Sequence, residues 1–450
     1  MGKGGERVVG EPRKVSAAGK VSAAELGNLS GIEILAQAPT EELRKRAELL
    51  GLPAAGEREE LLNELRPFAD GMMHRWQPPR PLPLHKPTMT YTDVMKAIPR
   101  HCFERSFAKS MVHLISDLAL ISALGYAASW ISHPAVPEWA GFLLWPLYWF
   151  AQGTVMTGVW VLAHECGHQA FSNSETANNI VGLICHSALL VPYHSWRITH
   201  AKHHANTGSC ENDEVFCPPT RESKQIPVQE PGHDMAQEMA HESPLVQAFF
   251  IVVMLLVGWM PGYLVFNCTG PRKYHGKSIS HFNPWAAMFE ERDRMDIVVS
   301  DLGFFAALAG LCYAISTLGF ATVGAFYLAP FLITNGYLVL ITYLQHTDVF
   351  MPHFRGDEWN WFRGALCTVD RSFGAIIDHT IHHIADTHVC HHLFHKMPFY
   401  HAQEATEAIK GVLGDYYLAD STSIPKALWR SYTCCKFIED DGGIVFYKKQ

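Results

Sequence analysis

The chain has 450 residues, a charged fraction of 18% and a formal net charge of −8, whereas about a quarter of the residues in soluble proteins are charged. The negative net charge offers no basic field for nucleic acid, which excludes nucleic-acid binding as the main function. Lys and Arg are absent from residues 110–196 and 295–354. Basic-free stretches of this length indicate an integral membrane protein rather than several soluble domains.

Residues 1–90 are polar and are expected to form a soluble cytosolic region with two short helices. The helical patterns cover 40–50 and 58–65, and Pro53 follows the end of the first. This pair loosely resembles the helix-extended-helix of the SAP motif. Glu57, Glu59 and Glu60 are acidic where a DNA-binding helix would be basic, so a structural or docking role is favoured.

Four apolar stretches are long enough for a helix to cross a hydrocarbon core of roughly 30 Å, which takes about 20 residues. The short connections within the two pairs, 132–138 and 319–322, contain no Lys or Arg. The positive-inside rule therefore places both termini and the central region in the cytosol. The predicted spans are 111–131, 139–162, 297–318 and 323–343.

A fifth apolar stretch, 244–266, is interrupted by Pro261 and has basic residues on both flanks. Because both flanks favour the cytosol, we expect an in-plane or re-entrant element there. The expected fold is thus an all-α integral membrane protein with about four transmembrane helices and a cytosolic helical cap. Its membrane domain covers 91–435, and a cytosolic tail, 436–450, follows.

Histidine spacing is the most informative feature of the sequence. With 26 His in 450 residues, a triplet of the form HxxHH is expected only about 0.1 times by chance. On a helix, positions i, i+3 and i+4 share one face, so each triplet can direct three imidazoles to one point. Three such triplets are present, at 200–204, 379–383 and 388–392.

A further cluster, His164-Glu165-Cys166-Gly167-His168, follows directly on the second predicted span. Together with two triplets it supplies eight imidazoles, which exceeds the need of one four-coordinate zinc and suits two metals such as iron. Few carboxylates accompany these histidines, which argues against a glutamate-based di-iron bundle. The eleven cysteines show no paired framework and are interpreted as free thiols.

Two other functions compete with a di-iron centre. HECGH also satisfies the zinc-hydrolase pattern HExxH, with Glu165 as general base. A membrane zinc protease would need only one further ligand, so two of the HxxHH triplets would have no function. A metal transporter would place its ligands inside the spans. Here the clusters lie beside the spans, which favours a metal centre at the membrane surface.

These motifs together resemble the membrane fatty-acid desaturases, specifically the microsomal-type oleate Δ12 (omega-6) branch. The three histidine boxes of that family read HECGH at 164–168, HAKHH at 200–204 and HVCHH at 388–392. LLVPYHSW, NTGSCENDEVF, ITYLQHTD and TVDRSFG are also similar to stretches of the plant and algal enzymes. The resemblance extends from about Cys102 to Tyr432.

The resemblance implies two iron ions held by the boxes, O₂ as co-substrate, and electrons from NADH through cytochrome b5 and its reductase. Since the chain has no His-Pro-Gly-Gly haem motif, the cytochrome is expected to be a separate partner. The implied substrate is an oleoyl chain on phosphatidylcholine in the endoplasmic reticulum membrane, converted to a linoleoyl chain. Δ15 desaturation and hydroxylation on the same scaffold remain alternatives.

Spacing alone leaves open which of the tandem triplets, 379–383 or 388–392, binds metal. The family pattern DTHVCHH selects the second, and His346 in LQHT resembles an additional family ligand. Glu165, His382 and Asp386 are then expected to support the ligands through hydrogen bonds. The implied metal ligands are His164, His168, His200, His203, His204, His346, His388, His391 and His392.

Overall fold

The computed structural model describes residues 39–41, 43–44, 55–62, 82–226 and 243–449. The chain divides into two compact units, the first made of Met1–Glu48 with Leu52–Gln77 and the second of Leu49–Gly51 with Pro78–Gln450. In the first unit, the described parts of 40–44 and 58–62 are helical, as predicted. The remainder of these two predicted helices lies outside the described residues.

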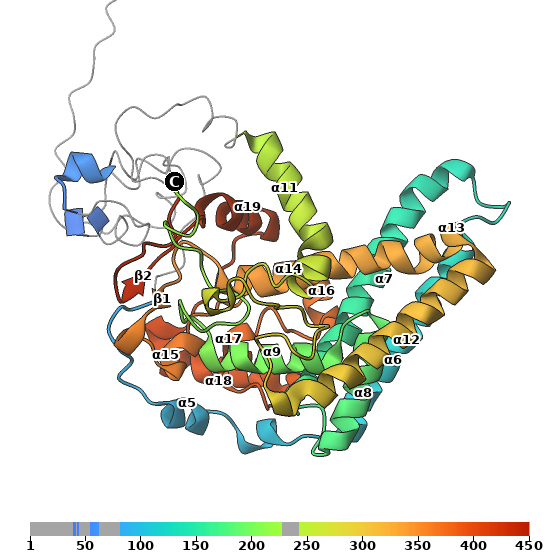
Figure 1. Ribbon diagram of the computed structural model, residues 1–450, viewed down its shortest axis with the longest axis horizontal. Helices are drawn as coiled ribbons and strands as arrows, with labels where there is room; N and C mark the ends of the chain where they lie inside the picture. Colours follow the sequence, from blue (N-terminus) through green and yellow to red (C-terminus); the bar gives the residue numbers. More distant parts are fainter. Residues whose placement is uncertain (1–38, 42, 45–54, 63–81, 227–242, 450) are drawn as a thin grey trace, which may run out of the picture. The chain divides into compact units, whose positions relative to one another are not determined.

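The second unit is built on long helices that extend away from a group of shorter ones (Figure 1). The long helices are α6 (Phe107–Ser129), α7 (Glu138–Gly167), α12 (Arg294–Leu318) and α14 (Ala329–His346). A short helix, α13 (Phe320–Val323), and a π-helical turn, η5 (Gly324–Leu328), lead into α14. Helix α7 packs against α6, α8 and α14 and is the central element of the unit.

Four helical segments among the described residues have the length and composition to cross a membrane. Three of them, Phe107–Ser129, Glu291–Leu318 and Phe320–His346, coincide with predicted spans. Helix α7 covers the remaining predicted span with 30 residues but is not among the four. Its Trp, Tyr, Gly, Thr and Gln residues lower its hydropathy, and from Gln152 to Cys166 every side chain is buried by neighbouring helices.

The fourth candidate is Pro244–Tyr263, which joins α11 (Pro244–Val257) to the π-helical turn η2 (Gly258–Tyr263). Its mean hydropathy of 2.1 is the highest of the four, and only 11% of its most apolar window is buried. Both α11 and η2 pack on α14. Length and composition alone would allow this segment to cross, so the expected in-plane or re-entrant placement stays a prediction.

Short helices and turns form the rest of the unit, as expected for a helical cap. They are α5 (Tyr91–Ala97), α8 (Glu175–Ala188), α9 (Tyr193–Asn206), α15 (Trp361–Ala365), α16 (Ala375–Thr380), α17 (His388–Leu393), α18 (Ala402–Leu413) and α19 (Ile424–Cys434). The 3₁₀ turns between them are η1 (Arg100–Phe103), η3 (Arg272–Tyr274), η4 (Glu291–Asp293), η6 (Gly356–Glu358), η7 (Phe399–His401) and η8 (Gly414–Tyr416).

One small antiparallel sheet pairs β1 (His353–Phe354) with β2 (Ile444–Val445). Phe437 and Ile438 are also buried. Residues 436–449, expected to form a tail, therefore belong to the same compact unit as the helices. All eleven cysteines are free in the structure.

Candidate metal centre

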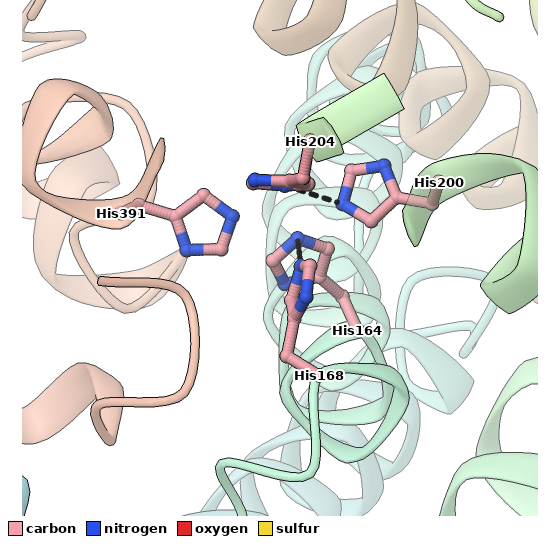
Figure 2. A group of neighbouring side chains, drawn as sticks. All are labelled: His164, His168, His200, His204 and His391. Atoms are coloured by element: carbon pink, nitrogen blue, oxygen red, sulfur yellow. Dashed lines mark hydrogen bonds between the residues drawn. The ribbon is translucent and has the colours of Figure 1, made fainter. Parts of the chain in front are cut away.

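The first of two histidine groups gathers five imidazoles from three helices (Figure 2). The C-terminal end of α7 with its C-cap and the C-terminal half of α9 each contribute two at i, i+4 spacing, and α17 contributes one. Their ligand nitrogens all lie within 4.8 Å of one another. The members of group one are His164, His168, His200, His204 and His391.

The second group lies beside the first and contains His203, His346 and His392. His346 is the last residue of α14, and its Nε2 lies 3.3 Å from Nε2 of His203. Nε2 of His388 is 3.2 Å from the same His346 atom, so His388 belongs to this side as well. Consecutive residues on α9, and again on α17, thus serve different groups. All nine histidines implied as ligands lie in these two groups.

The donor set fits two metal ions. Nε2 of His164 lies 3.1 Å from that of His168, and Nε2 of His200 lies 3.2 Å from that of His204. Metal–imidazole bonds of about 2.1 Å place neighbouring donors about 3.0–3.4 Å apart, so these separations suit ligands of one ion. Nε2 of His391 and of His392 are buried without a hydrogen-bond partner, as expected of atoms that face a metal.

Burial keeps these imidazoles in the neutral form that binds metals. Burial, and secondarily the neighbouring imidazoles, hold the pKa of His164, His168, His204 and His391 well below the usual range. The pKa of His388 falls to about 3, chiefly through burial. A neutral imidazole has a lone pair for coordination and no positive charge to repel a cation.

Hydrogen bonds to the other ring nitrogen orient several of these histidines, which is the usual arrangement around a protein-bound metal. Nδ1 of His203 lies 2.7 Å from Oδ1 of Asp213, which also accepts hydrogen bonds from the backbone N–H groups of Val215 and Phe216. Nδ1 of His388 donates to the Ile384 carbonyl at 3.0 Å. These contacts direct Nε2 of both imidazoles toward the metal position.

Glu165 lies on the far side of His164 from the other ligands. Its Oε1 is 3.3 Å from Nδ1 of His164, and its Oε2 accepts a hydrogen bond from the Phe399 N–H at 3.2 Å. Burial raises the pKa of Glu165 to about 8. A carboxyl on the Nδ1 side of the imidazole, away from the Nε2 donors of group one, is not placed to be the general base of a zinc hydrolase.

A comparison of the sequence with known protein families supports the presence of this metal centre. The family model for fatty acid desaturases matches residues 137–423, which include all nine clustered histidines. The chain belongs to the fatty acid desaturase family. It is an oxidoreductase with a lipid substrate and histidine groups that can hold metal ions.

Similar desaturases are found in fungi and plants. The chain is 49% identical over 369 residues to a "Delta(12) fatty acid desaturase" from Mortierella isabellina, covering 81% of this chain and 91% of the relative. It is 44% identical over 379 residues to a "Delta(12)-acyl-lipid-desaturase" from Punica granatum, covering 83% and 94%. Over 360 residues it is 45% identical to an "Omega-6 fatty acid desaturase, endoplasmic reticulum" from Brassica juncea, covering 80% and 90%.

The other tandem triplet of the desaturase, 379–383, does not converge on a point. His382 and His383 have positive φ angles of 56° and 61°, which end the helix within the triplet. Nε2 of His382 lies 2.7 Å from Oδ2 of Asp117 on α6, Nδ1 of His383 lies 3.0 Å from Asp386, and His379 is exposed. His382 and Asp386 were expected to support the ligands, but they contact these other residues instead.

Two residues of the desaturase centre were not predicted. Asp213 is one, although it stands in the NTGSCENDEVF motif that resembles the family. His395 is the other: its ring lies 5.2 Å from the rings of His168 and His204, and burial lowers its pKa to about 4. As a single histidine three residues after His392, it had no pattern to distinguish it.

Proposed function

We propose that this desaturase introduces a cis Δ12 double bond into oleoyl chains of membrane lipids, with O₂ as co-substrate, and so forms linoleoyl chains. The observation that carries the proposal is the pair of adjoining, buried histidine groups, nine imidazoles in all. The Δ12 position is supported by relatives at 42–49% identity whose names specify Δ12 or oleate desaturation. The lipid is proposed to be phosphatidylcholine.

The metals are proposed to be two iron ions, because many neutral imidazoles and few carboxylates suit iron. When bound, they supply with O₂ the oxidant needed to remove hydrogen from an unactivated methylene, which side chains cannot supply. The proposed ligands are His164, His168, His200, His204 and His391 for one ion and His203, His346, His388 and His392 for the other. Two electrons from NADH reach the centre through a separate cytochrome b5 and its reductase.

The protein's own part in this reaction is orientation and exclusion of water. Asp213 holds His203 in one tautomer, and the carbonyl of Ile384 does the same for His388. Except for His200, which is partly buried, the proposed ligands expose less than a tenth of their surface. This burial favours reaction of the acyl chain over side reactions with bulk water.

We infer that the centre faces the cytosol of the endoplasmic reticulum, with residues 1–90 and the C-terminal end on the same side. A single crossing by 244–263 would separate its ends by the bilayer core, roughly 30 Å. Yet Nζ of Lys436 donates to Oε1 of Gln247 near one end, and the hydroxyls of Tyr263 and Thr199 lie 3.1 Å apart at the other. Thr199 precedes His200 on α9, and Lys436 follows α19, which packs on α14, the helix that ends at His346. Contacts of both ends with the cap support a re-entrant or in-plane segment.

Expression in a yeast that lacks polyunsaturated lipids tests the activity directly. We expect linoleate to appear in the membrane lipids, with its new double bond at Δ12, and to be absent when His391→Ala is expressed to the same level. A Δ15 product or a hydroxylated acyl chain would contradict the Δ12 assignment. Purified protein that forms linoleate but contains no iron would contradict the di-iron assignment.

A further inference from the structure

A third cluster of metal-binding side chains lies outside the two histidine groups. His101 and Cys102 stand in η1, just before the membrane helix α6, and His401 and Glu404 stand at the start of α18. One donor atom from each of the four lies within 4.8 Å of all the others. The two pairs are about 300 residues apart in the chain, so the fold alone brings them together.

The separations suit a tetrahedral ion. Nε2 of His101 lies 2.9 Å from Oε2 of Glu404 and 3.7 Å from Sγ of Cys102, and Nδ1 of His401 lies 3.9 Å from the same Glu404 oxygen. Zinc bonds of about 2.0–2.1 Å to N or O and about 2.3 Å to S place tetrahedral donors about 3.3–3.6 Å apart. Only small side-chain movements are needed to enclose an ion.

Burial and charge also favour a cation here. Cys102 is fully buried and the side chain of His401 is 16% exposed, while those of His101 and Glu404 are about half exposed. A thiolate and a carboxylate would neutralise a divalent ion. Because a cysteine binds Zn²⁺ as the thiolate, binding would release the Cys102 proton.

We propose that His101, Cys102, His401 and Glu404 form a structural Zn²⁺ site, separate from the catalytic metals. Four protein ligands complete a tetrahedral shell and leave no position for a substrate, which is the mark of a structural zinc site. The ion ties the segment that precedes α6 to α18. Since α18 packs on α17, which carries His388, His391 and His392, the zinc fixes the third histidine box to the start of the membrane domain.

Cobalt substitution distinguishes this site from the histidine centre. A Co²⁺ ion bound to a thiolate shows a near-ultraviolet sulfur-to-metal absorption, which a centre of imidazoles alone does not show. We expect this absorption when the full-length, detergent-solubilised protein is loaded with Co²⁺. It should vanish in Cys102→Ala and persist in Cys268→Ala, which removes an exposed cysteine outside the cluster. Wild-type protein without the absorption, or its persistence in Cys102→Ala, would overturn the proposal.

A second measurement avoids changing the buried cysteine. Glu404→Gln alters a half-exposed ligand and should lower Zn²⁺ affinity by at least roughly tenfold. Glu407→Gln is the matched control, because Glu407 lies three residues farther along α18 with a 71% exposed side chain and pairs with Lys410 instead. Equal Zn²⁺ affinity in the Glu404→Gln and Glu407→Gln proteins would contradict Glu404 as a ligand.

Discussion

The choice between the tandem triplets can be tested with three alanine variants. His391 is buried in group one, His382 pairs with Asp117 across to α6, and His379 is exposed. The three histidines share one side-chain chemistry and lie within 13 positions of one another. The structure nevertheless predicts a different defect for each replacement.

For His391→Ala we expect loss of a metal bond, because its Nε2 has no other partner. Loss of a residue that only orients a ligand typically costs 10–100-fold in metal affinity or activity, roughly 1.4–2.7 kcal/mol. Loss of the ligand itself should exceed this, so we expect iron-depleted protein that forms no linoleate.

For His382→Ala we expect a folding defect. Removing the imidazole leaves the Asp117 carboxylate, whose side chain is only 12% exposed, without its 2.7 Å partner. Leaving a buried hydrogen-bonding group without its partner costs about 1–3 kcal/mol. His379→Ala should change stability by less than about 0.5 kcal/mol, since surface substitutions usually do.

The assay measures three quantities on each purified protein: iron per folded chain, linoleate formed from oleate in yeast, and thermal unfolding in detergent. We expect His391→Ala to lose iron and product, His382→Ala to unfold at lower temperature with iron per folded chain retained, and His379→Ala to resemble the wild type. Iron loss in His379→Ala with full iron in His391→Ala would refute the assignment.

Three further predictions follow from the centre and its surroundings. Asp213→Asn weakens the charge-assisted contact to His203 and should lower the affinity for iron roughly 10–100-fold in a chelator titration. Unchanged iron affinity would show that Asp213 does not orient His203. Arg371→Met removes a fully buried partner of Asp348 and Asp420 and should lower the free energy of unfolding by about 3 kcal/mol. The control Arg292→Gln, at a side chain that is 79% exposed, should change the free energy of unfolding by less than about 0.5 kcal/mol. Equal unfolding temperatures for the two variants would contradict this prediction. Burial alone would raise the pKa of Asp420, but Arg371 and Arg430 lower it from 3.8 to about 2. The ionised Asp420 therefore stabilises the fold above pH 4, and this stabilisation is lost as the pH falls toward 2. Acid unfolding of Arg371→Met should begin at a higher pH than that of the wild type.

Much of the metal centre could be predicted from the sequence because the histidines of each box are neighbours in the chain and lie on one helix. The i, i+3 and i+4 spacing of imidazoles on a helix places donors on one face wherever the helix lies. The placement of HECGH, HAKHH and HVCHH beside apolar spans located the groups relative to the membrane helices. Four of the apolar stretches also correspond to the long helices α6, α7, α12 and α14.

What the sequence alone left open depends on contacts between distant segments. Triplets 379–383 and 388–392 have the same spacing, but only the second is helical throughout, because His382 and His383 adopt positive φ where His382 turns to Asp117. Asp213 was not predicted because one carboxylate in a loop has no periodicity, and only the fold places it against His203. The convergence of His101 and Cys102 on Glu404 is likewise invisible in the chain. Local spacing determines which side chains can act together on one helix, whereas tertiary packing decides which helices meet.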